Sequence, residues 1–327
     1  MLSREDVRAL LDLDALIDAL AVAMADLSAG RASVPDRIGA AVPERDGALM
    51  AMPGHVPALG ALAGKLVSLF PQNAGTGVPT HHAVIAVFDA QTGAPTALLD
   101  GTEITAARTG ACSALSARLL AREDASVLAV LGTGVQARSH ARALVRVRPV
   151  RELRFAGRDP ARAQAVAAEM GEELGVEARA AATYEEALAG ADVVCATTHA
   201  TEPVVRREWL TPGTHVTSVG YNPAGRELDD ATVAEALVCV ESRRAVLAPI
   251  PSGSNDLRAP IEAGVISAEQ LHELGEVVTG ASPGRTSRDQ ITLYKSVGVA
   301  VQDAAAAALV VAAARDRGIG HDLDWSA

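Results

Sequence analysis

The sequence predicts an α/β protein with two domains. Its 327 residues exceed what one hydrophobic core ordinarily holds. After Asp124, short apolar runs alternate with helical patterns, an order typical of a parallel sheet covered on both faces. The first of these runs leads directly into a glycine-rich turn at residues 132–137, which indicates a ligand-binding connection between strand and helix.

The first part of the chain predicts an α+β unit. Two helical patterns occupy residues 4–29 and end at Gly30, a residue suited to the position after a helix. A further helix is predicted for residues 102–121. Between them lie three short β-rich runs, at residues 62–69, 83–88 and 95–99. The sheet of this unit is therefore expected to be antiparallel or mixed.

The second part predicts a parallel sheet. Its apolar runs are residues 127–131, 153–156, 193–196 and 215–219. A helical pattern follows the first run and extends through Val145, and another follows the second run and extends through Met170. A final alanine-rich helix is predicted from about Asp289 to Arg315. We expect this helix to leave the second part and pack on the first.

The composition excludes several classes of protein. Hydrophobic residues make up 49% and charged residues 21%, a balance typical of a soluble globular protein. A net charge of −11 opposes a duplex-binding surface, and 2% aromatic residues offer few platforms for stacking bases. Residues 1–6 lack the basic and apolar segments of a signal peptide, the longest apolar run is too short to span a bilayer, and the three cysteines are widely spaced. We expect a cytoplasmic protein with no nucleic-acid partner, membrane partner or metal.

The turn at residues 132–137 predicts a dinucleotide site of the Rossmann type. Gly132 would permit the tight turn, Gly134 would let the backbone approach a pyrophosphate, and Ala137 would allow close packing of helix on strand. The following helix would present free N–H groups to the phosphates. A purely structural turn is the alternative. The residues expected to contact the cofactor are Gly132, Thr133, Gly134, Val135, Gln136 and Ala137, with Thr197 and Val219 at the ends of later strands.

The end of the second strand of this domain bears on which cofactor is bound. An NAD site usually places an acid there for the ribose 2′-hydroxyl. Here the chain has Gly157-Arg158, and a guanidinium suits the 2′-phosphate of NADP. Asp159, next to Pro160, fits the N-cap of the following helix better than a ribose contact. NADP(H) is therefore favoured over NAD(H), and a merely solvated Arg158 is the alternative.

Four charged or titratable side chains stand in unusual places. Lys65 lies inside an apolar strand pattern, where a charge is costly unless it has a task or a partner. Arg108 lies near the start of a helix, where a cation is disfavoured and an anionic partner is indicated. His81 and His82 precede a strand and face opposite ways, so at most one faces a pocket. Each also has an ordinary structural interpretation, such as a lysine whose head reaches water.

Together these segments resemble the ornithine cyclodeaminase/mu-crystallin family, which also includes archaeal-type alanine dehydrogenases and ketimine reductases. The matching stretches follow the family's order through nearly the whole chain. They are Met52-Pro53, Gly64-Lys65-Leu66-Val67, Pro79-Thr80, Asp89-x-x-Thr92-Gly93, Asp100-Gly101-Thr102 through Arg108-Thr109, Gly132 through Ala137, and Thr292 through Gly298.

The resemblance implies a fold, an assembly and a substrate site. A Rossmann domain of residues 122–299 would be inserted into a discontinuous α+β substrate and dimerisation domain of residues 1–121 and 300–327. The protein would be a homodimer. By the match, Arg37 and Arg108 would bind the substrate carboxylate, and Lys65 would contact the carboxylate or assist proton transfer.

Two positions depart from the cyclodeaminases of this family. A cyclodeaminase carries a catalytic aspartate in the loop after the fourth Rossmann strand, where this chain has Asn222. Asn222 would still contact substrate, but a neutral amide cannot act as a base. A cyclodeaminase also has a glutamate two residues before the Met-Pro pair, where this chain has Met50. Both changes remove anions that would hold a diamino acid.

The resulting hypothesis is an NAD(P)H-dependent reductase of an α-imino acid, such as piperideine-2-carboxylate or pyrroline-2-carboxylate, or a related amino-acid dehydrogenase. The arginines would fix the carboxylate, and Lys65, a water or His82 would supply the proton. One alternative is an ornithine cyclodeaminase, which forms proline and ammonia. Another is a non-catalytic, mu-crystallin-like protein that binds a small ligand, but the retention of Lys65 and Arg108 favours catalysis.

Overall fold

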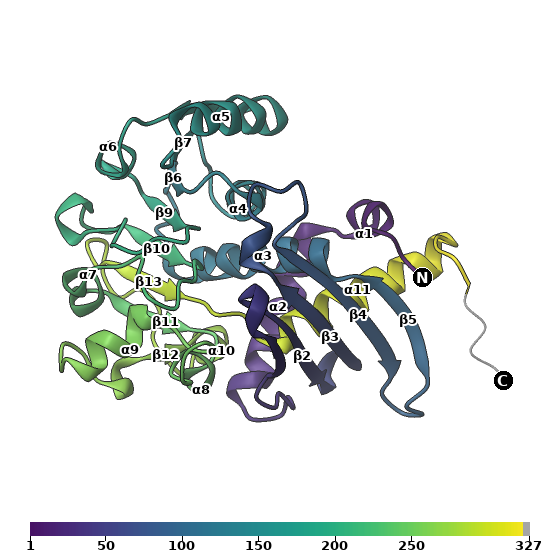
Figure 1. Ribbon diagram of the computed structural model, residues 1–327. Helices are drawn as coiled ribbons and strands as arrows, with labels where there is room; N and C mark the ends of the chain where they lie inside the picture. The colour runs from purple at the N-terminus through teal and green to yellow at the C-terminus, as the bar shows by residue number, and fades with distance from the viewer. Residues whose placement is uncertain (323–327) are drawn as a thin grey trace. The chain divides into compact units, whose positions relative to one another are not determined.

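The computed structural model describes residues 1–322, whose contacts divide the chain into two compact units (Figure 1). Unit 1 is Met1–Arg108 together with the C-terminal segment from Val299, and unit 2 is Thr109–Gly298. The first division falls inside helix α3 (Gly101–Leu120), whereas the sequence placed it at the end of that helix, because one helix serves both units. Residues 323–327 of the predicted substrate domain lie outside the described residues.

Unit 1 combines helices with one antiparallel sheet, in which the strands pair in the order β1-β2-β3-β4-β5. Its helices are α1 (Arg4–Leu10), α2 (Leu13–Ser28), the first part of α3, and α11 (Ala300–Arg317). Its strands are β1 (Ile38–Val42), β2 (Gly47–Val56), β3 (Ala61–Leu69), β4 (His81–Asp89) and β5 (Pro95–Asp100). Short 3-10 helices lie at η1 (Pro43–Arg45), η2 (Pro57–Leu59) and η3 (Pro71–Asn73).

The sheet of unit 1 has one buried face, because apolar side chains alternate along its central strands. Ala63 and Val67 of β3 point to the same side and are buried, whereas Leu66 beside them is exposed. Helix α11 packs on β2 and β3 and also contacts α2 (Figure 1). The sequence did not predict β1 and β2, since their glycine- and alanine-rich stretches carry few β-branched residues.

The C-terminal helix is shorter than the sequence predicted. The prediction began it at about Asp289, but α11 begins at Ala300, and Thr292–Lys295 form strand β13 of unit 2. That run is fully buried between two neighbouring strands, so tertiary packing overrides the alanine-rich context that follows. The expected packing of the helix on the first part of the chain is confirmed. None of the helices within residues 1–322 is long and apolar enough to cross a membrane.

Unit 2 is built on an eight-stranded parallel sheet with the order β12-β11-β13-β10-β9-β6-β7-β8. Its remaining strands are β6 (Val127–Leu131), β7 (Glu152–Ala156), β8 (Glu177–Ala180), β9 (Val193–Ala196), β10 (His215–Ser218), β11 (Leu237–Val240) and β12 (His272–Glu273). Its helices are α4 (Val135–Leu144), α5 (Pro160–Leu174), α6 (Tyr184–Leu188), α7 (Asp230–Glu235), α8 (Arg243–Val246), α9 (Asn255–Glu262) and α10 (Leu274–Thr279), with η4 (Arg207–Trp209) and η5 (Ala268–Gln270).

The strand order of unit 2 reverses at β6, which lies between β7 and β9. In parallel sheets of this type ligands bind at the carboxyl ends of the strands beside such a reversal. The glycine turn follows β6 and therefore lies at that place. The predicted Rossmann fold, separate from an antiparallel sheet, is confirmed.

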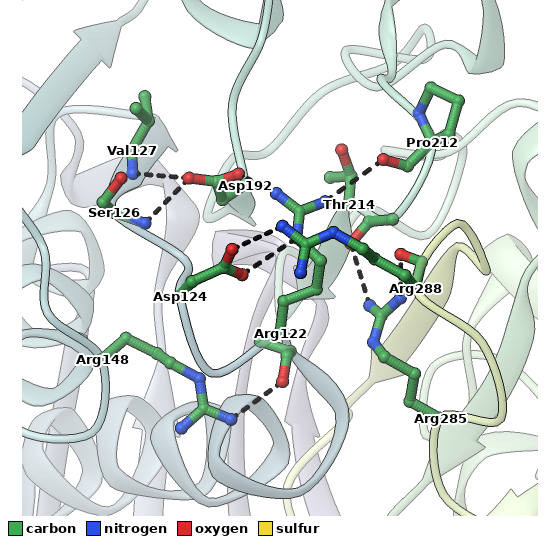
Figure 2. A network of polar contacts seen from close by, with 12 residues as sticks. Arg122, Asp124, Ser126, Val127, Arg148, Asp192, Pro212, Thr214, Arg285 and Arg288 are labelled. Atoms are coloured by element: carbon green, nitrogen blue, oxygen red, sulfur yellow. Dashed lines mark hydrogen bonds and ion pairs between the residues drawn. The ribbon is translucent and has the colours of Figure 1, made fainter.

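A network of arginines and aspartates closes the opposite, amino-terminal edge of this sheet (Figure 2). Asp192, just before β9, accepts hydrogen bonds from the N–H groups of Ser126 and Val127 at 2.8 and 3.0 Å. It also pairs with Arg122, whose side chain points toward it in Figure 2. The other arginines of the network are Arg148, Arg285 and Arg288. The network satisfies backbone groups at this edge, which lies opposite the edge that carries the glycine turn.

Candidate active site

Lys65 lies on the buried face of the unit 1 sheet. It occupies the middle of β3, opposite Met52 of β2 and Ile85 of β4, and is only 3% exposed. Ala63 and Val67, its neighbours on that face, are apolar, so the alternation that buries them also buries the ammonium. A charge in such a place requires a partner of opposite sign.

The partner of Lys65 is Asp303, near the start of α11. Asp303 Oδ2 accepts a hydrogen bond from Lys65 Nζ at 2.6 Å, and its Oδ1 accepts from Arg108 Nε at 3.2 Å. Arg108 Nη1 also donates to Gln302 Oε1 at 2.8 Å. All four side chains are buried. The structure thus brings together Lys65 and Arg108, as the sequence predicted, on a carboxylate that the sequence analysis missed.

A third predicted carboxylate ligand, Arg37, is half-buried in the segment before β1. Its positive charge acts on Lys65 through space. We call Lys65, Arg108, Arg37 and Asp303 the cation cluster. Because Lys65 and Arg108 share one carboxylate, the pair keeps a net positive charge, which favours the binding of a further anion.

The surroundings of Lys65 make its ammonium easier to deprotonate. Burial lowers the pKa of Lys65 to about 8; Arg108 and Arg37 act in the same direction, and Asp303 opposes them. Burial also disfavours the charged form of Asp303, but Lys65 and Arg108 outweigh burial and hold the pKa of that carboxyl below its usual value. At neutral pH Lys65 therefore carries a proton that it releases more readily than an exposed lysine does.

The two histidines of β4 bear on one prediction, because His82 was expected to be a proton donor. His82 is exposed and lies opposite Ser68 on the face of the sheet away from Lys65. A shift of one residue along a strand reverses the face, so the position of His82 does not support its predicted role. His81 lies on the Lys65 face, where burial first, and then Lys65 and Arg108, lower its pKa to about 4. His81 is therefore neutral at pH 7.

The glycine turn of unit 2 has the geometry of a phosphate cradle. Gly132 has φ +117°, and a Cβ there would lie 2.6 Å from Thr197 Oγ1, so only glycine fits. Gly134 is the N-cap of α4, makes no side-chain cap, and has nothing within 4 Å of the position of a Cβ. Ala137 is fully buried, which brings α4 close to the sheet. The backbone at the start of α4 is therefore open to a phosphate.

The remaining residues of the turn also fit a bound dinucleotide. Val135 is 65% exposed at the start of α4. The Thr133 carbonyl accepts a hydrogen bond from Arg138 Nη1 at 2.9 Å, which fixes the turn. Gln136 Oε1 is buried and has no hydrogen-bond partner among the described residues. A buried polar atom without a partner is costly, so a ligand that donates to Gln136 would stabilise the turn.

The end of β7 carries the residues that bear on cofactor choice. Arg158 is exposed, and a Cβ at Gly157 would lie 2.9 Å from Thr133 Cγ2, so this segment runs against the glycine turn. Asp159 caps α5, accepting hydrogen bonds from the N–H groups of Ala161 and Arg162 at 3.0 and 3.2 Å. The predicted N-cap is confirmed, and the carboxylate is already used.

Thr197 and Val219 follow β9 and β10 at the same edge of the sheet as the glycine turn. Thr197 donates from its N–H and from Oγ1 to the Leu131 carbonyl, at 2.9 and 2.8 Å. Val219 N–H donates to the Ala196 carbonyl at 3.0 Å. These bonds hold the starts of both loops against the strands, and a cofactor contact of Thr197 and Val219 stays a prediction.

Asn222, predicted to contact substrate, uses its amide within the loops of unit 2. Its Nδ2 donates to the His199 carbonyl at 3.2 Å, and its Oδ1 accepts from the Ala224 N–H at 2.9 Å. The side chain thus joins the loop after β10 to the loop after β9. The structure shows these loop contacts, and a substrate contact of Asn222 stays a prediction.

A buried network beneath that loop was not predicted. Lys295 Nζ donates to Ser218 Oγ at 3.0 Å, to the Gly220 carbonyl at 2.8 Å, and pairs with Asp256 at 2.8 Å. Glu227 Oε2 accepts from the Gly220 N–H at 2.9 Å. The network anchors the start of the loop that carries Asn222. The composition could have drawn attention to Lys295, because Lys65 and Lys295 are the only lysines of the sequence.

Comparison with known proteins gives matches along nearly the whole chain. The profile of the ornithine cyclodeaminase/mu-crystallin family matches residues 1–318. A Delta(1)-pyrroline-2-carboxylate reductase of Bacillus cereus is 34% identical over 99% of both chains. The structure of Thermococcus litoralis Delta(1)-pyrroline-2-carboxylate reductase in complex with NADH and L-proline superposes with a TM-score of 0.93 at 38% identity, over 98% of this chain and 99% of that one. An archaeal alanine dehydrogenase dimer with bound NAD gives 0.91 at 31% identity, over 99% and 98% of the two chains.

Proposed function

This chain belongs to the ornithine cyclodeaminase/mu-crystallin family, and on that premise we propose that it reduces the C=N bond of α-imino acids with a nicotinamide dinucleotide. The substrate class is a cyclic imine carboxylate, such as pyrroline-2-carboxylate or piperideine-2-carboxylate. The observation that carries the proposal is the buried cation cluster, in which Lys65 and Arg108 share one carboxylate. The pyrroline-2-carboxylate reductases that resemble this chain in sequence and structure support the same class.

The cation cluster binds the substrate carboxylate. Arg108 and Arg37 present guanidinium groups, whose planar donors suit a carboxylate and keep their charge at any accessible pH. Because Lys65 and Arg108 share one carboxylate, the pair keeps a net positive charge that a substrate carboxylate would offset. Fixing the carboxylate also fixes the adjacent imine carbon, which is the atom to be reduced.

Lys65 holds the proton that the product amine requires. With its pKa lowered to about 8, Nζ is protonated at neutral pH and yields its proton readily. His81 is neutral on the same face, so it adds no further charge to the cluster. The nicotinamide dinucleotide, when bound, supplies the hydride.

For the cofactor, we propose that the glycine turn of unit 2 binds the pyrophosphate and that NADP(H) is preferred. Arg158 is exposed beside that turn, where a guanidinium suits a 2′-phosphate. Asp159 is occupied as the cap of α5, so it is a poor partner for a ribose 2′-hydroxyl. The similar solved structures hold NADH or NAD, so the preference for NADP(H) rests on Arg158.

We also propose a homodimer that forms through the outer face of the unit 1 sheet. Leu66 of β3 pairs directly with Val84 of β4, and they are 51% and 45% exposed. Leu49 of β2 and Ile38 of β1 are also exposed. An apolar sheet face of this kind is typical of a protein interface. The similar archaeal alanine dehydrogenase is described as a dimer.

Two positions disfavour the alternative, ornithine cyclodeamination. Asn222 is neutral, and its amide is engaged in loop contacts. Met50 packs against the apolar cluster formed by Met52, Val67 and Ala83. Neither residue offers a carboxylate for the δ-ammonium of ornithine. A purely ligand-binding protein is also disfavoured, because Lys65 and Arg108 are both retained and lie together on Asp303.

The proposal is tested by following NADPH and NADH consumption with a panel of substrates. The panel contains pyrroline-2-carboxylate, piperideine-2-carboxylate, and pyruvate with ammonia or methylamine. L-ornithine with NAD is incubated in parallel, and proline is sought by mass spectrometry. We expect rapid reduction of at least one cyclic imine and little proline from ornithine. Efficient proline formation without imine reduction would reverse the order of the two functions.

A further inference from the structure

We infer that Asp303 is a positioning residue for the proposed reduction, which holds the Lys65 ammonium as the proton carrier and fixes Arg108 beside it. The inference rests on the proposed function and names a residue that the sequence motifs did not single out. It is carried by the two contacts of the carboxylate, 2.6 Å to Lys65 Nζ and 3.2 Å to Arg108 Nε.

The backbone of unit 1 is shaped to bring Asp303 over β3. A Cβ on Gly54 of β2 would lie 3.0 Å from the carbonyl carbon and the Cβ of Ala300, the first residue of α11. The absence of a side chain at Gly54 therefore lets the start of α11 approach the sheet closely. Asp303, one turn into the helix, then meets Lys65 from above the buried face. A carboxylate near a helix N-terminus is also favoured by the helix dipole.

The contacts of Lys65 leave N–H donors that a substrate could use. An ammonium has three N–H donors, and within residues 1–322 Lys65 Nζ makes one hydrogen bond, to Asp303. Arg108 is held at two of its nitrogens, by Asp303 and by Gln302. Asp303 therefore orients both cations through one oxygen each, without saturating the ammonium. If Lys65 and Asp303 only stabilised the fold, we would expect further acceptors around Lys65 to satisfy its remaining N–H donors.

The charges around Lys65 show what Asp303 changes. Arg108 on α3 and Arg37 before β1 face Lys65 and disfavour its ammonium, while His81 on β4 is neutral. Of the residues that the structure describes, Asp303 is the negative group placed against them. Without its charge, burial and the two arginines would act on Lys65 unopposed. Lys65 would then lose its proton at a lower pH, closer to or below neutrality.

The composition of the chain allows a direct test. Because Lys65 and Lys295 are the only lysines, protein labelled with ¹³C at lysine Cε gives two side-chain signals, and Lys295 serves as an internal reference. We expect the Lys65 signal of the wild type to titrate near pH 8. In Asp303→Asn the midpoint is expected to fall by about one pH unit or more. Asp26→Asn is the matched control, since Asp26 is a buried carboxylate of unit 1 that pairs with Arg31 instead. An unchanged Lys65 midpoint in Asp303→Asn would overturn the inference.

The kinetic readout separates positioning from simple stability. In the wild type, kcat/KM for imine reduction is expected to fall as pH rises through about 8, and in Asp303→Asn this fall begins at lower pH, with kcat reduced at least tenfold. Asp303→Glu keeps the charge but moves it by a methylene group. It is expected to keep the Lys65 midpoint while losing at least about tenfold in kcat.

Two further outcomes are decisive. If Asp303→Asn does not fold, Asp303→Glu decides alone, and wild-type kcat in that variant overturns the positioning role. If the wild type reduces no imine, the proposed function fails, whereas the lysine titration still reports whether Asp303 controls the Lys65 proton.

Discussion

The two lysines of this chain occupy similar places and differ in how their ammonium groups are satisfied. Lys65 of unit 1 and Lys295 of unit 2 both lie in strands, both are buried, and each pairs with an aspartate, at 2.6 and 2.8 Å. Lys295 finds three acceptors, Ser218, Gly220 and Asp256, which match its three donors. Lys65 has one acceptor among the described residues, and two arginines act on it from nearby.

The difference separates a structural charge from an available one. A buried ammonium whose donors are all used stabilises the loop it holds, but it offers nothing to a ligand. A buried ammonium with donors to spare costs more to fold, and that cost is offset only when a ligand arrives. Burial alone therefore does not mark a functional lysine; the count of acceptors around it does.

The largest effect is expected when Lys65 is replaced. Lys65→Met keeps the length of the side chain but removes the proposed proton carrier, so kcat for imine reduction is expected to fall by roughly 10²- to 10⁴-fold. Asp303 keeps Arg108 as its partner, so the free energy of unfolding is expected to change little. Steady-state kinetics and urea unfolding of the same preparation measure both quantities. A variant that retains kcat would remove Lys65 from the chemistry.

Lys295→Met is expected to lower the free energy of unfolding more, and kcat less, than Lys65→Met does. The substitution leaves Asp256 buried without its cation, and breaking a buried pair from one side costs about 3–5 kcal/mol of unfolding free energy. The kcat of the folded variant is expected to fall less than in Lys65→Met, because Lys295 acts only through the loop it anchors. Urea unfolding checks the stability, and the comparison breaks down if Lys295→Met loses more kcat and less stability than Lys65→Met.

The parts of the molecule that the sequence predicted well depend on local signals. The glycine turn of residues 132–137 needs only a strand before it, a helix after it and the spacing of its glycines, and all of these are visible in a few residues. The N-cap of α5 at Asp159 was equally visible, because an acid before proline suits a helix start. Lys65 and Arg108 stood out as charges that contradict their local patterns.

What the sequence did not predict depends on long-range packing or on strand phase. Asp303 lies 238 positions from Lys65, and no local sequence pattern around either residue indicates that they pair. His82 was chosen over His81 although the two differ only in which face of β4 they occupy, and pairing with β3 decides that face. Strand β13 was absorbed into a predicted helix, because its burial between β10 and β11 is a property of the sheet.

The same criterion, whether the donors of a cation already have partners, applies to the arginines that follow β7. The smallest effect on kinetics is expected there. Among the described residues Arg158 has neither a hydrogen-bond nor an ion-pair partner, whereas Arg162 nearby pairs with Asp159 at 3.4 Å. An unpartnered guanidinium beside the phosphate cradle is available to a 2′-phosphate, and a hydrogen bond to a charged group contributes about 1.5–3 kcal/mol. Arg158→Ala is therefore expected to raise KM for NADPH by roughly tenfold or more and to leave KM for NADH nearly unchanged.

Arg162→Ala is the matched control for that prediction, since it removes an equally positive and exposed side chain from the same segment. It is expected to leave the ratio of the two KM values as in the wild type, because a general loss of positive charge acts too weakly on an exposed, screened phosphate. If both variants weaken NADPH binding alike, the effect is one of net charge and Arg158 has no special contact. If the unmodified protein uses NADH and NADPH equally well, Arg158 does not select the cofactor. The number of partners around a cation would then identify an available group when the group is buried, as in the cation cluster. It would not do so for the exposed Arg158, because water can satisfy a guanidinium as well as a ligand can.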